Sequence, residues 1–158
     1  MSTRILMVCH GNICRSTMAE YVLRHLVRQA GLQGQILVDS AATSREEFGN
    51  GVHPGTQRVL AAHGIPCGSH RARQMTRADY ERYDLIVGMD QANLRNMRRI
   101  AGGDPQGKLH LLLDWADEPR AIADPWYTGD FETTYADVAE GCATLLDWLT
   151  REGRSRHA

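Results

Sequence analysis

The sequence lacks most of the features that define specialised classes of proteins. Its 158 residues include four cysteines, five prolines and two phenylalanines, with no repeat and no low-complexity tract. The cysteines do not form the pattern of a disulfide framework, so we expect a reducing compartment, the cytoplasm. No apolar stretch approaches the roughly 18 residues that cross a membrane, and the apolar start of the chain is too short for a signal peptide.

An excess of charge of one sign is also missing. The chain has 18 Lys and Arg against 19 Asp and Glu, so neither nucleic acid nor a membrane is an expected partner. The seven histidines show no spacing typical of metal ligands, and the sequence predicts no metal and no other cofactor. With 42% hydrophobic and 23% charged residues, the composition predicts one globular domain over residues 1–158.

One stretch, Cys9-His10-Gly11-Asn12-Ile13-Cys14-Arg15-Ser16, is notable for its position. It follows the apolar run 5–8 and precedes a helical pattern that begins at about Ser16. A strand, a tight loop and a helix N-terminus in this order bring backbone N–H groups around one point, which suits an anion. Arg15 adds a planar fork of donors for two phosphate oxygens, and these surroundings favour the thiolate form of Cys9. A nucleophile inside an anion cradle predicts covalent phosphoryl transfer.

Three more short apolar runs, 36–38, 85–87 and 109–113, alternate with helical patterns. This alternation predicts an α/β fold: a single domain with a four-stranded parallel sheet, helices on both faces, and a phosphate-binding loop between strand 1 and helix 1. Parallel strands present their carboxyl ends at one edge, where ligands bind. The residues at these ends are Cys9, Ser40, Asp90 and Asp114.

The loop after the fourth strand should emerge at the same edge. It contains Asp124-Pro125-Trp126-Tyr127. Cleavage of a phosphate ester needs a proton for the departing oxygen, and Asp124 is the candidate acid, since Pro125 restricts its backbone. Trp126 and Tyr127 are candidates for pocket walls that grip an aromatic ring, with ordinary packing as the alternative.

These segments resemble the low-molecular-weight protein tyrosine phosphatases. The resemblance also covers the segments 39–44 (DSAATS), 63–66 (HGIP), 70–74 (HRARQ) and 89–90 (MD), while Thr17 stands where the family more often has proline. It implies a hydrolase that cleaves phosphotyrosine and small aryl phosphates through a phosphocysteine intermediate, with Cys9, Arg15 and Asp124 as catalytic residues. It further implies that the loop is braced by Asn12, Ser16, Ser40 and His70. The substrate-binding residues would be His10, Gly11, Asn12, Ile13, Cys14, Ser16, Phe48, Trp126 and Tyr127.

One position leaves the substrate preference open. Family members that prefer phosphotyrosine often carry an aromatic residue near Glu46, whereas this chain has Glu46-Glu47-Phe48. Phe48 either takes the place of that aromatic residue or packs in the core. The expected partners are a protein that contains phosphotyrosine, or an aryl phosphate. A partner tyrosine kinase would supply such proteins, and the sequence does not identify one.

Three alternatives remain beside this interpretation. An arsenate reductase on the same fold needs resolving cysteines between about residues 70 and 90, and Cys67 and Cys142 lie outside that segment. A phosphoarginine phosphatase is the second alternative, but the resemblance to that branch implies a threonine in the loop where this chain has Ile13. A non-enzymatic flavin-binding or phosphate-binding module would explain the cradle, but it leaves Cys9 and Asp124 without a purpose.

Overall fold

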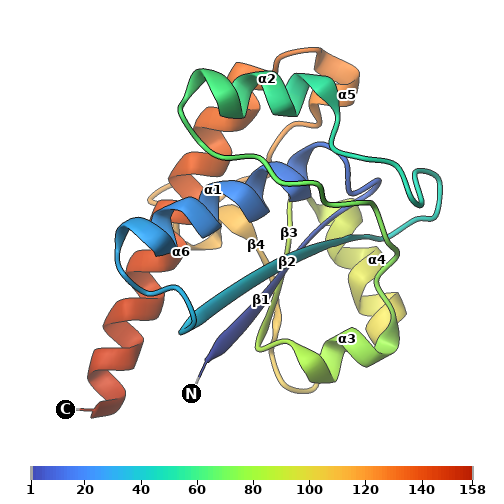
Figure 1. Cartoon of the computed structure of the whole chain (residues 1–158). Coiled ribbons are helices and arrows are strands. Elements are labelled where there is room, and N and C mark those ends of the chain that lie inside the picture. Colours follow the sequence, from blue (N-terminus) through green and yellow to red (C-terminus); the bar gives the residue numbers. More distant parts are fainter. Residues whose placement is uncertain (1, 158) are drawn as a thin grey trace.

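The four apolar runs form the four strands of one parallel sheet in the computed structural model, which describes residues 2–157 and the side chains of residues 2–151. The strands are β1 (Thr3–Cys9), β2 (Ile36–Ala42), β3 (Leu85–Gly88) and β4 (Leu109–Leu111), in the spatial order β2-β1-β3-β4. All three pairings are parallel. The predicted fold is therefore confirmed (Figure 1).

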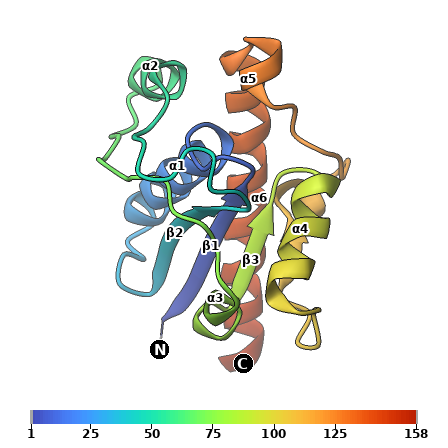
Figure 2. The ribbon, with the colours of Figure 1, turned by 90° about the vertical axis from the view of Figure 1, so that its right-hand side faces the viewer.

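Helices connect the strands and cover both faces of the sheet. They are α1 (Arg15–Gln29), α2 (Pro54–Ala62), α3 (Arg77–Arg82), α4 (Gln91–Ala101), the 3-10 helix η1 (Leu112–Trp115), α5 (Pro125–Thr128) and α6 (Phe131–His157). Figure 2 shows α1 and α4 on opposite sides of the strands. None of the described helices is both long enough and apolar enough to span a membrane.

The alternation of side chains along β1 divides the core into two layers. Ile5 and Met7 pack in the layer formed with α1, α2 and α6, whereas Leu6 and Val8 pack in the layer formed with α3 and α4. All four side chains are fully buried, because β1 lies in the middle of the sheet. This central strand holds Cys9 at its carboxyl end in a fixed position.

Helix ends follow local chemistry in most places. Asp90 accepts a hydrogen bond from the Asn93 N–H at 2.8 Å and begins α4, and Gly102 ends that helix in the left-handed conformation. The Thr76 N–H donates to the Asp79 carboxylate at 2.8 Å, as part of a capping box at the start of α3.

The end of the fourth strand differs from the prediction. The apolar run 109–113 suggests one strand, but β4 ends at Leu111 and the chain turns into η1. The Asp114 carboxylate causes this turn by accepting a hydrogen bond from the Leu111 N–H at 2.9 Å. Strand β2, in contrast, runs past Ser40 to Ala42, which pairs with Cys9. An apolar run alone therefore marks a strand but not its last residue.

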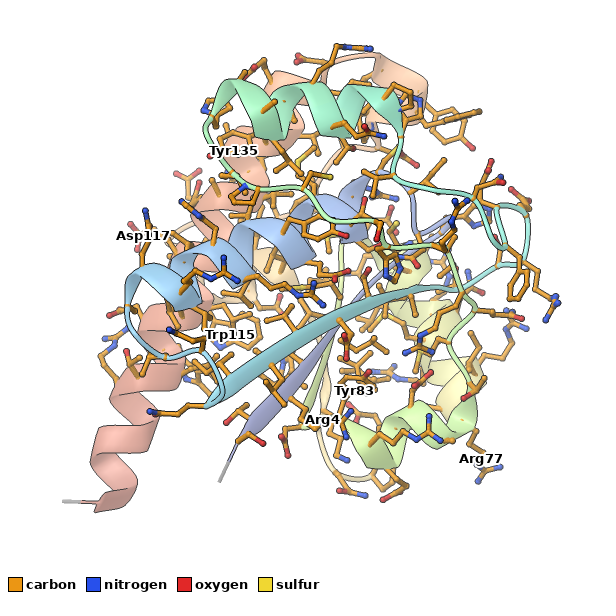
Figure 3. The ribbon with its side chains drawn as sticks, in the orientation of Figure 1. Arg4, Arg77, Tyr83, Trp115, Asp117 and Tyr135 are labelled. Atoms are coloured by element: carbon orange, nitrogen blue, oxygen red, sulfur yellow. The ribbon has the colours of Figure 1, made fainter. Side chains whose placement is uncertain are left out.

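The loop before β3 is tied to the sheet by one aromatic side chain. The Arg4 guanidinium lies 5.0 Å from the centre of the Tyr83 ring, and the Tyr83 hydroxyl donates to Asp39 at 2.8 Å (Figure 3). These contacts join β1, β2 and the start of β3.

Helix α6 packs closely on η1 because residue 141 is glycine. A Cβ atom there would lie 2.6 Å from the Leu112 Cγ and 3.1 Å from the Leu112 carbonyl oxygen. We predict that Gly141→Ala lowers the free energy of unfolding by about 1–3 kcal/mol through overpacking. Gly51→Ala is the control, since no atom lies within 4 Å of a Cβ there. Urea denaturation of both variants measures the effect, and equal stability of the two would contradict the close packing.

Candidate active site

Three loops meet at the carboxyl edge of the sheet. They are the segment 10–14 after β1, the segment 43–48 after β2 and the segment 122–127, which follows η1 and runs into α5 (Figure 1). The pocket between them is lined by Cys9, His10, Gly11, Ile13, Cys14, Glu46, Glu47, Asp124, Trp126 and Tyr127. The segment around Asp124 thus meets Cys9, as expected from the shared edge of parallel strands.

The Cys9 sulfur lies inside the curl of its own loop. The N–H groups of Asn12 and Ser16 point at it from 3.3 and 3.4 Å, and the Ser16 Oγ lies 3.1 Å away. The Ser16 Oγ accepts a hydrogen bond from the Asn12 Nδ2 at 2.8 Å, so its own proton is free to point at the sulfur. Hydrogen-bond donors thus surround the Cys9 sulfur on several sides.

The loop also leaves backbone donors without protein acceptors. In residues 2–157, no group accepts a hydrogen bond from the N–H of Gly11, Ile13 or Cys14. Asn12 makes this curl possible with a φ of 63°, the one positive φ outside glycine in the described chain. Free backbone donors around a sulfur form a cradle for an anion with several oxygens.

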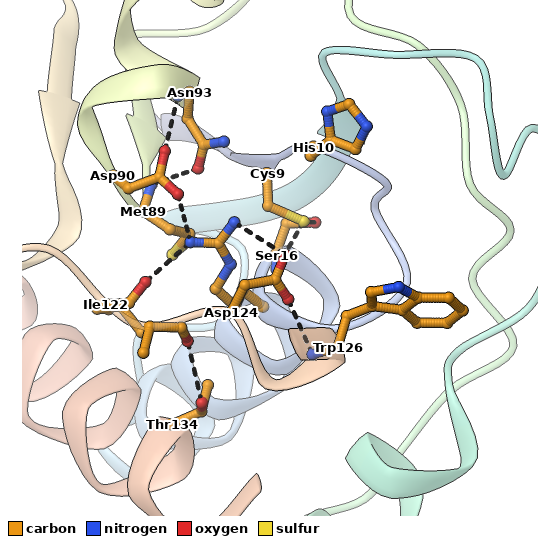
Figure 4. A network of polar contacts seen from close by, with 12 residues as sticks. Cys9, His10, Ser16, Met89, Asp90, Asn93, Ile122, Asp124, Trp126 and Thr134 are labelled. Carbon is orange, nitrogen blue, oxygen red and sulfur yellow. Dashed lines mark hydrogen bonds and ion pairs between the residues drawn. The ribbon is translucent and has the colours of Figure 1, made fainter. Parts of the chain in front are cut away.

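Arg15 closes the cradle with a buried guanidinium. Its Nη1 donates to the Asp90 Oδ2 at 2.7 Å and to the Ile122 carbonyl at 2.8 Å, and its Nη2 to the Asp124 Oδ2 at 3.4 Å (Figure 4). Its Nε is buried as well, and no group of the described chain accepts its proton. An unpaired buried donor is costly, so this N–H is available for a ligand oxygen.

Opposite charges keep Arg15 ionised despite its burial. Burial alone would lower the pKa of its guanidinium, but the charge of Cys9, the hydrogen bond to Asp90 and the charge of Asp124 raise it above its ordinary value. The guanidinium is therefore positively charged at neutral pH.

A chain of side chains braces the loop from behind. His70 donates through Nε2 to the Asn12 Oδ1 at 2.7 Å, because an amide oxygen can only accept. The same Nε2 lies 3.3 Å from the Ser40 Oγ, whose proton goes to Glu20 at 2.5 Å. With Asn12 in contact with Ser16, the four residues expected to brace the loop do lie in one network.

Glu20 is the member of this network that sequence reasoning missed. Its side chain is 1% exposed, and burial raises the pKa of its carboxyl group. Arg24 contacts it at 2.7 Å from the next turn of α1. A glutamate at an otherwise apolar position of that helix is the signal that would have indicated it.

Asp124 begins a helix instead of lying in an irregular loop. Its Oδ1 accepts a hydrogen bond from the Trp126 N–H at 3.1 Å, and Pro125 occupies the first turn of α5. The residues before it are also fixed, because the Ile122 N–H donates to the Met89 carbonyl at 2.9 Å and Thr134 donates to the Ala123 carbonyl at 3.1 Å (Figure 4). Sequence reasoning missed α5, whose four residues are too few for a periodic pattern.

The aromatic residues of the pocket come from α5. Trp126 and Tyr127 both line it and are 57% and 82% exposed, so neither is explained by core packing. His53 lies edge-on to Trp126, with ring centres 5.8 Å apart, and stacks on Phe131. This contact holds one aromatic wall in place, and nothing in the sequence around His53 indicates it.

Phe48 lies outside the pocket. It is 58% exposed, so it is not in the core, and its ring carries the Arg45 guanidinium at 4.8 Å. Glu46 and Glu47 line the pocket in its place. The alternative that Phe48 packs in the core is therefore wrong, and its expected role in substrate binding stays a prediction.

The other strand-end carboxylates have different roles. Asp90 contacts Arg15 as well as capping α4, a second role that its sequence position did not predict. Asp114 holds the turn into η1 and does not line the pocket. The described residues contain no group of three or more His, Cys, Asp and Glu side chains placed to hold a metal ion.

Comparison with known proteins identifies the family to which this sequence is similar. Residues 4–155 match the family described as low molecular weight phosphotyrosine protein phosphatase. The chain belongs to this family. It is 38% identical over 150 residues to the Bacillus subtilis low molecular weight protein-tyrosine-phosphatase YfkJ, covering 94% of this chain and 96% of that protein. It is 40% identical over 148 residues to the human low molecular weight phosphotyrosine protein phosphatase, covering 90% and 93%.

Solved structures of other proteins share the whole architecture of this chain. The crystal structure of YfkJ has a TM-score of 0.93 to this chain over 96% of it and 97% of that chain, at 38% identity. A drosophila arginine phosphatase gives a TM-score of 0.83 at 29% identity over 92% and 97%. The low molecular weight phosphatases are phosphoric monoester hydrolases, and phosphotyrosine-containing proteins are the substrates that the family implies for this chain. The fold alone does not separate tyrosine from arginine as the phosphate carrier.

The four cysteines of this phosphatase are unpaired and differ in their surroundings. Burial and the neighbouring charge of Cys9 raise the pKa of Cys14 to about 12, and burial alone raises that of Cys142. Cys67 is exposed.

We predict that iodoacetamide at pH 7 labels Cys9, the proposed nucleophile, and Cys67, which is exposed, but neither Cys14 nor Cys142, whose thiols are buried and have strongly raised pKa values. Peptide mapping by mass spectrometry measures the labelling. Inorganic phosphate should protect Cys9 and leave Cys67 unprotected. Labelling of Cys14 at the rate of Cys9 would contradict the assigned difference between them.

Proposed function

We propose that Cys9, Arg15 and Asp124 carry the phosphotyrosine phosphatase activity through a phosphocysteine intermediate. The observation that supports it best is the cradle around the Cys9 sulfur: free backbone donors, and a buried Arg15 whose Nε has no partner in the described chain. Three equatorial oxygens of a phosphoryl group fit such donors, and their charge is matched by Arg15.

In the first step the Cys9 thiolate attacks phosphorus in line with the phenolic oxygen. The sulfur–phosphorus bond forms while the bond from phosphorus to the tyrosine oxygen breaks, and Asp124 gives its proton to that oxygen. Loop amides and Arg15 stabilise the equatorial oxygens throughout. No charge is left on the departing phenol, which leaves as tyrosine.

In the second step a water molecule attacks the phosphocysteine. Asp124, now ionised, accepts a proton from the water as the new oxygen–phosphorus bond forms, and the sulfur–phosphorus bond breaks. The products are inorganic phosphate and the Cys9 thiolate, and Asp124 is protonated again. The contact of Asp124 with Arg15 at 3.4 Å holds its carboxyl group beside the cradle in both steps.

The pocket walls favour a phenyl ring as the phosphate carrier. Ile13 and Trp126 present apolar surface near the cradle, which suits a flat ring better than a guanidinium. The phosphoarginine alternative would be expected to have threonine at the position of Ile13. We therefore propose phosphotyrosine, and small aryl phosphates in vitro.

We also propose that the protein acts in the cytoplasm on the products of a tyrosine kinase. All four cysteines lack a disulfide partner, which suits a reducing compartment, and a thiolate nucleophile needs one. A kinase follows from the chemistry, because some enzyme must form the phosphotyrosine that this protein consumes.

Cys9→Ser tests the covalent step. We predict loss of turnover, since a serine hydroxyl is not ionised at neutral pH, with phosphate binding largely retained because Arg15 and the loop amides remain. Hydrolysis of phosphotyrosine and calorimetric binding of phosphate measure the two properties. Cys67→Ser is the matched control and should keep full activity, as Cys67 lies outside the pocket. More than a small fraction of wild-type activity in Cys9→Ser would exclude the covalent mechanism.

Asp124→Asn tests the general acid. We predict that cleavage slows by roughly 10²–10⁴-fold for phosphotyrosine and much less for activated aryl phosphates, whose leaving groups need no proton. A series of aryl phosphates of rising phenol pKa measures this: the rate of phosphocysteine formation should depend weakly on that pKa in the wild type and steeply in Asp124→Asn.

The control is Asp117→Asn, which changes an exposed carboxylate on the same connection (Figure 3). It should keep the weak dependence of the wild type. Equal slopes for Asp124→Asn and the wild type would mean that Asp124 is not the acid.

A further inference from the structure

Two kinds of side chain line the pocket around the cradle. Ile13, Trp126 and Tyr127 are apolar or aromatic, whereas Glu46 and Glu47 are carboxylates. We call the pair Glu46 and Glu47 the acidic wall. The base of the pocket is a cradle for an anion, so the sign of the charge changes from the base to the mouth.

Glu47 is fixed against the phosphate-binding loop. Its Oε2 accepts a hydrogen bond from the Asn50 Nδ2 at 2.6 Å, and its Cγ would lie 3.3 Å from a Cβ on Gly11. Its charge helps to raise the pKa of Cys14, so it acts inside the pocket. Such a carboxylate cannot turn away from a ligand without losing the bond to Asn50.

Glu46 stands further out and is 70% exposed. Its Oε2 lies 3.0 Å from the Nε2 of His10, which is itself half-exposed at the pocket mouth. Glu46 thus presents its carboxylate at the pocket mouth, beside any group that leaves the pocket.

No lysine or arginine offsets the acidic wall at the pocket mouth. The described lining residues include neither residue type. Two cations on or beside this loop make other contacts: Arg45 lies over the Phe48 ring, and Arg71 donates to the Gly49 carbonyl at 3.2 Å. Arg15 is buried at the base and already contacts two carboxylates.

We propose that the acidic wall makes this phosphatase select phosphotyrosine flanked by lysine or arginine over phosphotyrosine flanked by acidic residues. The proposal rests on the proposed function, in which the phosphate fills the cradle and the ring lies along Ile13 and Trp126. The residues before and after the tyrosine then lie at the mouth, beside Glu46 and Glu47. Lysine or arginine side chains of the substrate are attracted to these carboxylates, whereas glutamate or aspartate side chains are repelled by them.

The test uses phosphotyrosine peptides that differ only in their flanks. One peptide carries lysine on both sides of the phosphotyrosine, a second carries glutamate there, and a third carries alanine. For the wild type at pH 7.5 and low salt, kcat/KM should be roughly 3- to 10-fold higher for the lysine peptide than for the glutamate peptide, the size of a few exposed charge contacts. The ratio should fall towards one at about 0.5 M salt, where such charges are screened.

Variants assign the preference to the acidic wall. Glu46→Gln and Glu47→Gln should each reduce the lysine-to-glutamate ratio, and Glu46→Lys should bring it below one. Glu81→Gln is the matched control, because Glu81 is an exposed carboxylate on α3. Helix α3 precedes the amino end of β3, whereas the pocket lies at the carboxyl edge of the sheet. Glu81→Gln should leave the ratio as it is in the wild type.

Two failures are distinguishable. If the wild type hydrolyses none of the three peptides, the proposed function itself fails. If it hydrolyses all three with the same kcat/KM, or if Glu46→Lys keeps the wild-type ratio, the proposed function stands and the selectivity of the acidic wall is overturned.

Discussion

The site depends on one buried cation. Arg15 lies at the start of α1 with its side chain 3% exposed, and such a charge is tolerated in the interior only with partners of opposite charge. Its partners come from three places: Asp90 at the end of β3, the Ile122 carbonyl, and Asp124 at the start of α5. Because one guanidinium contacts all three, it holds the nucleophile loop beside the segment with the candidate acid, although the two are more than a hundred residues apart in the sequence.

The same arrangement leaves the site prepared for an anion. The amides of Gly11, Ile13 and Cys14 and the Nε of Arg15 have no acceptors in the described chain, so the cradle holds donors that a phosphate would satisfy. His70, Ser40 and Glu20 brace the loop through Asn12. A rigid brace on one side and free donors on the other are what electrostatic catalysis by preorganised groups requires. Binding of phosphate should therefore also stabilise the fold.

Sequence reasoning predicts the parts of this site that follow from local pattern and topology. The strand–loop–helix order around Cys9 gives the cradle, and the common edge of parallel strands brings the Asp124 segment to it. The features that it misses depend on tertiary contacts. The contact of Asp90 with Arg15 and the contact of the buried Glu20 with Ser40 can be found only when the positions of these partners in space are known. The outward direction of the Phe48 side chain depends on the conformation of the short loop after β2. The end of β4 was misplaced because the carboxylate of Asp114 outweighs the apolar character of 112–113.

The most direct test of the account is to trap the covalent intermediate. The wild-type enzyme would be mixed with an activated aryl phosphate, quenched in acid within milliseconds and digested, and the peptides analysed by mass spectrometry. The account predicts a burst of about one phenol per active site, with one phosphoryl group on the sulfur of Cys9. A burst with the phosphoryl group on another residue would contradict the account, as would steady turnover with no phosphorylated peptide at any quench time.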